Sequence, residues 1–252
     1  MKRTGIWSIA WALVPALTLA GVAAAQVGAH PAKKVRPCPG LTAPRAFSDH
    51  GRAAVEIQVS MAVDVDGAPN AYGPRGKKTL DVLRHAYSPK EAGRPRTVVG
   101  YMTEWEGGPP TVQHAGDPYP GYYVSQTDWA DRNNPRMEDP RRYLDARKIN
   151  YVVLGRAAMN AGVIMGDFVS VSSCRTGRTA YAIVGDSGNE SGAEGSLALV
   201  QNLGYRIVDG VEDSVDDREI VIRYYPKSNP GKLFFKRQED LDAVARKLGL
   251  GS

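Results

Sequence analysis

Residues 180–205, AYAIVGDSGNESGAEGSLALVQNLGY, decide the fold that we expect for this chain. The first residues form an apolar run of strand length, which stops at Gly185-Asp186. A glycine-rich, acidic loop follows this run. Apolar residues then recur at helical spacing, at Leu197, Leu199, Val200 and Leu203. The stretch therefore predicts a buried strand, a loop and the start of a helix.

Two carboxylates bracket the loop within this stretch. Asp186 stands where the strand ends, and Glu194 stands just before the helical pattern. A carboxylate that follows an apolar strand loses part of its hydration, which raises its pKa and favours a role in proton transfer. A carboxylate at a helix N-terminus is also stabilised by the helix dipole, which is a second explanation for Glu194. Two acids that face one cleft have the geometry for acid/base chemistry on a glycosidic bond.

Further strand patterns set the expected fold class. Residues 151–154, 165–171 and 218–225 are apolar runs of strand length, and residues 174–178 contain the glycine of a hairpin turn. Short strands joined by glycine turns are typical of an antiparallel β-barrel or sandwich. We expect a mainly β chain with one barrel domain and a few peripheral helices.

Weaker patterns occur on both sides of these runs. Val55, Ile57 and Val59 alternate with polar residues and predict a half-buried strand, and residues 97–102 and 121–125 are also strand-like. Helical spacing predicts a short helix over 80–87 and a surface helix over 238–248.

The N-terminus has the pattern of an export signal. Lys2 and Arg3 precede an apolar run over residues 6–22, and Ala23-Ala24-Ala25 supplies the small residues that a signal peptidase recognises. A membrane anchor is the alternative, but Pro15 interrupts the run, which is shorter than the roughly 20 residues of a spanning helix. We expect a secreted or periplasmic protein with a signal peptide at 1–25, an extended arm at 26–50 and a catalytic β-barrel domain at 51–252.

The charge balance argues against nucleic acid as a partner. The chain has 32 Lys+Arg against 27 Asp+Glu, and loss of Lys2 and Arg3 with the signal leaves 30 basic residues. The basic residues are dispersed, and no aromatic ladder is interleaved with them. We therefore expect no nucleic-acid partner, no membrane contact after signal cleavage, and a monomer.

Cys38 and Cys174 are the two cysteines of the chain. In an oxidising compartment they favour one disulfide between the N-terminal arm and a distant turn, and two free thiols are the alternative. Two cysteines and four scattered histidines cannot make a closed zinc site of the usual spacing. We expect no structural metal and no cofactor.

Asp64 and Asp66 lie two residues apart before Gly67, and the strand period places both carboxylates on one face. A calcium loop would need an oxygen ligand at its fifth position and a glutamate at its twelfth, where this chain has Ala68 and Arg75. Two explanations remain open. The pair caps a turn, or it lines a substrate groove.

Residues 104–120 form a long loop that combines aromatic and ionisable side chains. Loops of this kind in compact domains are either mobile or functional. Aromatic faces stack on sugar rings, so Tyr122, which follows the loop, is a candidate substrate-binding residue. Asp117, an ionisable residue of the loop, is a second candidate. A solvated turn residue is the alternative explanation for Asp117.

Taken in order, these segments resemble a known family. The strand before Gly185-Asp186, the glycine-rich loop and residues 192–199 (GAEGSLAL) are similar to the signature of the fungal-type chitosanases of glycoside hydrolase family seventy-five. Residues 62–74 (AVDVDGAPNAYGP) and 116–125 (GDPYPGYYVS) also fall in the order of the family, so the resemblance covers about residues 55–226. Residues 167–205 resemble, more faintly, double-psi β-barrel proteins such as rare lipoprotein A and the expansins.

The first resemblance implies a secreted endo-chitosanase that hydrolyses β-1,4-glucosamine linkages with inversion. Asp186 and Glu194 would be the catalytic pair, with Glu194 the better candidate for the acid, and Asp64 and Asp66 would bind glucosamine ammonium groups. An inverting pair stands roughly 6.5–9.5 Å apart to admit a water molecule. The loop between the two acids is shorter than in the fungal members, which bears on this separation.

Two other functions fit the same residues. A polycationic substrate favours an acidic enzyme, and the positive balance of this chain counts against chitosan. A glycosidase that cleaves peptidoglycan is therefore the second enzyme class. A non-catalytic carbohydrate-binding barrel is the third function, because a fold alone does not determine activity. Ser196 has neither a glycine two residues later nor a nearby histidine in the sequence, so it does not form a nucleophile elbow.

Overall fold

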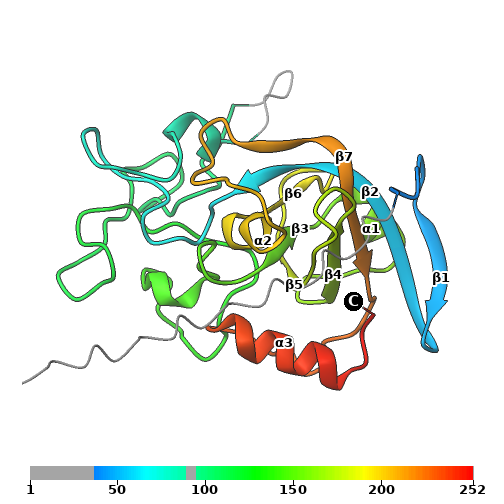
Figure 1. Ribbon diagram of the computed structural model, residues 1–252. Coiled ribbons are helices and arrows are strands. Elements are labelled where there is room, and N and C mark those ends of the chain that lie inside the picture. Colours follow the sequence, from blue (N-terminus) through cyan, green and yellow to red (C-terminus); the bar gives the residue numbers. More distant parts are fainter. Residues whose placement is uncertain (1–36, 89–94, 252) are drawn as a thin grey trace, which may run out of the picture. The chain divides into compact units, whose positions relative to one another are not determined.

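The computed structural model describes residues 37–88 and 95–251, and Figure 1 shows how their helices and strands are arranged. The expected signal peptide and residues 26–36 of the expected arm lie outside the described residues. The described part is mainly β, as predicted, and contains a closed, mixed β-barrel of six strands with a few short helices.

Six strands follow one another around the barrel. In spatial order they are β2 (Arg52–Asp64), β6 (Glu194–Ser196), β3 (Tyr151–Val153), β5 (Thr179–Asp186), β4 (Phe168–Ser173) and β7 (Ser214–Tyr224). The antiparallel pairing of β2 with β7 closes the ring.

The barrel is not purely antiparallel, which corrects the expectation. β2 pairs with β6 in parallel, and so does β3 with β5, while the other pairs are antiparallel. Parallel neighbours need a long connection between them, so they leave no hairpin signal in the sequence. The turn at residues 174–178, in contrast, joins the antiparallel strands β4 and β5 as predicted.

The barrel strands are buried on both faces, which explains their continuous apolar runs. Val152, Val169 and Val184 contribute to the cluster inside the barrel, together with residues of α2 (Leu197–Asn202). Their neighbours in sequence, among them Tyr151 and Ile183, belong to a second cluster that includes Leu241 of α3 (Gln238–Lys247). The predicted helices at α2 and α3 are therefore confirmed, and Figure 1 shows α3 beside the barrel.

β2 is more buried than its alternating pattern predicts. Glu56 and Gln58 point away from the barrel interior but are only 3% and 7% exposed. Glu56 pairs with Arg45 and Arg223, and the Gln58 amide donates a hydrogen bond to the Arg218 carbonyl. The expectation of a half-buried strand was wrong because these partners cover the polar face.

The expected N-terminal arm contains a strand. β1 (Arg45–Asp49) pairs antiparallel with the start of β2, and His50 and Gly51 form the turn with φ values of 48° and 80°. Upstream of β1, Cys38 and Cys174 form the predicted disulfide, which spans 136 residues of sequence. A disulfide is consistent with an oxidising or extracellular compartment.

The region between β2 and β3 is largely irregular. The strands predicted at 97–102 and 121–125 are isolated bridges, including Tyr101 with Ser125 and Val112 with Tyr123, so that prediction was wrong. Among the described residues of this region, helical structure is confined to η1 (Leu83–Ala86) and η2 (Pro140–Arg142). After β3 comes the short α1 (Arg156–Asn160). Within the described ranges, no helix has both the length and the apolar character needed to cross a membrane.

Candidate active site

Three aspartates meet where barrel strands end. Asp64 is the last residue of β2, Asp186 is the last residue of β5, and Asp66 follows β2 by two residues. One carboxylate oxygen from each lies within 4.8 Å of the other two. The Asp66 backbone N–H donates a hydrogen bond of 2.8 Å to Asp64 Oδ1, which holds the Asp64 carboxylate against the backbone of Asp66.

Glu194 joins this group from β6. Ala62 of β2 is opposite Glu194 and Asp64 is opposite Ser196, so Glu194 and Asp64 share one face of the sheet. Glu194 therefore lies on a strand and not at a helix start as expected. The N-cap of α2 is Ser196, whose Oγ accepts a hydrogen bond from the Leu199 N–H. We call Asp64, Asp66, Asp186 and Glu194 the acidic cluster.

The carboxylate of Asp186 is held by backbone donors. Its Oδ1 accepts hydrogen bonds from the N–H groups of Ser187, at 2.8 Å, and Asp128, at 3.2 Å. Its carbonyl accepts a hydrogen bond from the Leu154 N–H at 2.7 Å. The two N–H groups that donate to Oδ1 fix the side chain and favour its charged form.

Glu194 is held by a side chain of the intervening loop. Asn189 Nδ2 donates a hydrogen bond of 2.7 Å to Glu194 Oε1. The Asn189 carbonyl oxygen Oδ1 accepts hydrogen bonds from the N–H and the Oγ of Ser191, at 2.9 and 2.7 Å. The loop between the two predicted catalytic residues therefore positions one of them.

Two tyrosines also contact the cluster. Tyr72 Oη donates a hydrogen bond of 2.7 Å to Asp66 Oδ1. Tyr151 is fully buried, and its Oη donates a hydrogen bond of 2.9 Å to the Asp66 carbonyl oxygen. Sequence reasoning missed both tyrosines, and it missed Asn189. Tyr72 lies in the segment 62–74 that carries the family resemblance, whereas Tyr151 is indistinguishable in sequence from a core residue of its apolar strand.

The pKa values of the cluster are raised. Desolvation and the charge of Glu194 raise the pKa of Asp64 to about 7. Desolvation, followed by repulsion from Asp64, raises the pKa values of Asp66 and Asp186 well above the usual range. Desolvation also raises the pKa of Glu194, while the Asn189 hydrogen bond lowers it. The predicted elevation for Asp186 agrees with this, and the cluster can hold protons near neutral pH.

Glycines allow the segments that flank the cluster to pack closely against neighbouring backbone. Gly67 has a φ of 76°, and a Cβ there would lie 2.0 Å from the Leu144 carbonyl oxygen. A Cβ on Gly155 would lie 2.6 Å from Gly192, so the loop that carries Asn189 rests directly on the backbone after β3. These contacts set the position of the segments on either side of the cluster.

Asp117 and Tyr122 have their polar contacts elsewhere. Asp117 pairs with Arg141 at 3.2 Å and accepts a hydrogen bond from the His114 N–H. Tyr122 Oη donates to the Lys78 carbonyl oxygen at 3.1 Å. Their expected contact with substrate stays a prediction.

The acidic cluster offers oxygen ligands only. The three aspartate oxygens could hold a hard divalent cation, because Ca²⁺ and Mg²⁺ are bound by carboxylates. Alternatively, the same carboxylates share protons, as close acids do. The expectation that the protein needs no metal stays a prediction. Comparison with protein-family models and with curated protein sequences found no match to this chain.

Proposed function

We propose that this chain is a secreted glycoside hydrolase that cleaves β-1,4 linkages of an amino-sugar polymer, with Asp186 and Glu194 as its pair of carboxylic acids. The observation that carries the proposal is the meeting of acids from β2, β5 and β6 with pKa values raised by desolvation. A glycosidase needs one acid that stays protonated near neutral pH and a second carboxylate nearby.

The hydrogen bonds support a division of roles between the pair. Asp186 Oδ1 accepts two backbone N–H bonds, which offset part of the rise in its pKa, and we assign Asp186 as the base that takes a proton from water. Glu194 has one amide donor and is the acid that protonates the leaving glycosidic oxygen. The water oxygen then bonds to the sugar carbon as the glycosidic bond breaks, which inverts its configuration.

Asp64 and Asp66 complete the proposed site as the binders of amino-sugar ammonium groups. An ammonium placed among these carboxylates would replace their mutual repulsion with charge-assisted hydrogen bonds. The resemblance to the chitosanases of family seventy-five names chitosan as the first polymer to test. The closed, mixed barrel supports the fainter likeness to double-psi proteins, which stays part of this proposal.

The experiment measures release of reducing ends from soluble chitosan. Asp186→Asn and Glu194→Gln should each lower the rate by about 10²–10⁴-fold, because general acid/base groups contribute that much. Glu190→Gln is the matched control, since Glu190 belongs to the same loop, its side chain is 74% exposed and it pairs with Arg156. All three variants should keep a melting temperature close to that of the wild type.

Two outcomes would contradict the proposal. One is a wild-type protein that binds chitosan, chitin or peptidoglycan but releases reducing ends from none of them, which would leave a carbohydrate-binding barrel. The other is full activity in Asp186→Asn or Glu194→Gln, which would show that these two residues are not the catalytic pair.

A further inference from the structure

A concave site lies apart from the side chains of the acidic cluster. It is a groove of about 660 Å³, lined in part by Trp129, Met159, Ile164, Arg132, Lys227 and Lys232. We call it the basic groove. Its volume falls in the range of roughly 300–1,000 Å³ that is usual for small-ligand sites.

The charges of the basic groove have one sign. Three of its lining side chains are cationic, and none of its described lining residues is acidic. In the part of the chain that the structure describes, no carboxylate oxygen lies within 4.0 Å of a charged side-chain nitrogen of Arg132, Lys227 or Lys232. Unpaired cations that line a groove favour an anionic ligand.

Trp129 adds a hydrogen-bond donor and an apolar face. Its side chain is 6% exposed, and its indole Nε1–H has no acceptor among the described residues. The Arg132 guanidinium lies 5.8 Å from the centre of the ring. A buried donor without an acceptor is uncommon. Met159 and Ile164, which are 48% and 55% exposed, extend the apolar lining.

The backbone of the groove is strained where two cations stand. Lys227 and Lys232 have φ values of 58° and 51°, in the left-handed region that favours glycine. Asp167 braces this segment, because its Oδ1 accepts a hydrogen bond from Ser228 N–H and its Oδ2 accepts one from Ile164 N–H, both at 2.9 Å. Strain that the surroundings maintain in this way occurs often at ligand sites.

The groove adjoins the backbone that carries Asp186. The backbone N–H of Trp129 donates a hydrogen bond to the Gly185 carbonyl oxygen at 2.9 Å. Leu154 also lines the groove, and its backbone N–H donates to the Asp186 carbonyl oxygen. Residues that line the groove therefore share backbone hydrogen bonds with the end of β5.

We propose that the basic groove binds an acidic peptidyl substituent of a glycan. The cations pair with its carboxylates, and the apolar lining covers its carbon chain. The proposal rests on the proposed function for the glycan at Asp186, but the groove itself is tested by binding alone.

The probe is N-acetylmuramyl-L-alanyl-D-isoglutamine, a single sugar with an acidic dipeptide, and the reference ligand is N-acetylglucosamine. Neither has a glycosidic bond between two sugars, so binding is measured without hydrolysis. Titration calorimetry should show at least tenfold tighter binding of the probe. In a ¹H–¹⁵N spectrum the probe should shift the indole signal of Trp129.

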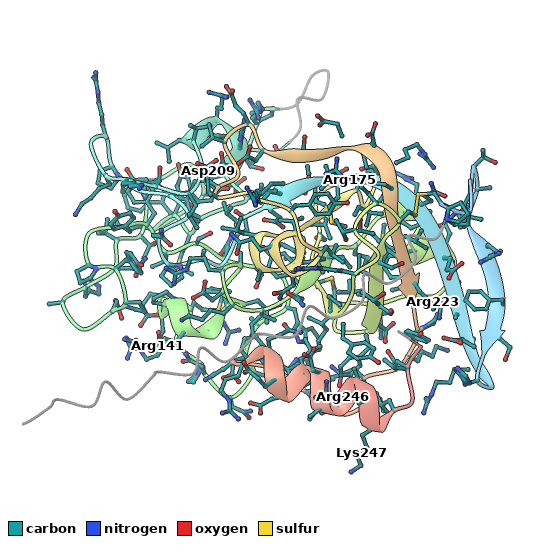
Figure 2. All side chains as sticks on the ribbon, in the orientation of Figure 1. Arg141, Arg175, Asp209, Arg223, Arg246 and Lys247 are labelled. Atoms are coloured by element: carbon teal, nitrogen blue, oxygen red, sulfur yellow. A yellow bond between two sulfur atoms is a disulfide. The ribbon has the colours of Figure 1, made fainter. Side chains whose placement is uncertain are left out.

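Variants locate the binding. The double variant Lys227→Gly/Lys232→Gly removes both ammonium groups and suits the left-handed backbone, so it should fold and lose at least tenfold in probe affinity. Lys247→Ala is the control, because Lys247 extends from α3 away from the barrel (Figure 2). It should leave the affinity unchanged.

Equal affinity for probe and reference, or unchanged probe affinity in the double variant, would overturn the groove proposal. Failure of the proposed function is seen separately. If the wild type binds the probe through these lysines but cleaves no glycan, the groove stands and the hydrolase assignment does not.

Discussion

The acids of the cluster differ in what holds them, although desolvation acts on each. Backbone N–H groups hold Asp186, a loop amide holds Glu194, and a tyrosine hydroxyl holds Asp66. Asp64 is affected by the charge of Glu194, and its own charge acts on Asp66 and Asp186. Removal of one of these partners should therefore shift the pKa of the acid that it contacts, and this shift can be measured.

Asn189→Ala tests which acid protonates the leaving group. The Asn189 hydrogen bond lowers the pKa of Glu194, so its loss should raise that pKa. If Glu194 is the general acid, the alkaline limb of the pH–rate profile moves to higher pH, because Glu194 keeps its proton longer. The measurement is the initial rate of reducing-end release from pH 4 to 9.

The same profile has an outcome that reverses the assignment. If Glu194 is the base, the acidic limb moves to higher pH and the alkaline limb stays in place. Glu190→Gln on the same exposed loop should move neither limb.

Asp64→Asn tests the raised pKa through stability. The folded state holds the Asp64 proton up to a pKa of about 7, against an ordinary value of 3.8, so this group stabilises the fold at low pH. That contribution is lost as pH rises from about 4 to 7. The melting temperature of the wild type should fall more across this window than that of Asp64→Asn. A difference of about 1 kcal/mol would appear as roughly 2–4 °C.

If the melting temperatures of the wild type and Asp64→Asn change in parallel between pH 4 and 7, the pKa of Asp64 is not raised. Glu190→Gln should follow the wild type, because its carboxylate is exposed.

At the scale of elements, the sequence predicted the strands whose residues are buried on both faces. β3, β4, β5 and β7 coincide with apolar runs, since their side chains enter either the barrel or the outer cluster. Residues 97–102 also have an apolar run but lack a continuous partner strand. Strand formation depends on such a partner, which a local pattern does not contain.

The candidate site was predictable only in part for the same reason. Asp186 follows an apolar strand, and Asp64 and Asp66 share the strand period, so local patterns point to them. Their meeting depends on the position of β6 between β2 and β3, which is a non-local pairing. Tyr151 and Asn189 reach the cluster through that arrangement, and their own sequence context carries no sign of it.

Gly155→Ala tests how the loop after β5 is positioned. A Cβ at Gly155 would lie 2.6 Å from Gly192 Cα, so the loop must move and Asn189 must move with it. We expect loss of activity with a destabilisation of about 1–3 kcal/mol, which is the usual cost of overpacking. Activity and urea unfolding are the measurements.

The control for this variant is Gly116→Ala. Gly116 has an ordinary φ, and no atom lies within 4 Å of the position that its Cβ would take. Unchanged activity in Gly155→Ala would show that the contact with Gly192 does not position the loop.

At the scale of the whole molecule, the disulfide links two regions that lie far apart in sequence. Cys38 precedes β1, and Cys174 lies in the turn between β4 and β5. A bridge across 136 residues restricts the unfolded chain strongly, and disulfides typically contribute about 2–4 kcal/mol. The variant Cys38→Ser/Cys174→Ser should therefore melt roughly 5–15 °C lower than the wild type.

Reductant separates this effect from a packing defect. Dithiothreitol should lower the melting temperature of the wild type toward that of the double variant and leave the double variant unchanged. A reduced wild type that melts like the oxidised protein would show that the bridge contributes little to stability.

The seam between β2 and β7 also determines when folding can finish. Arg218 and Gln58 meet across this seam although 160 residues separate them, so the barrel cannot close until β7 is available. Pairing of segments so distant in sequence is slow, because the chain loses entropy before the contacts form. During synthesis, the barrel therefore stays open until β7 has emerged.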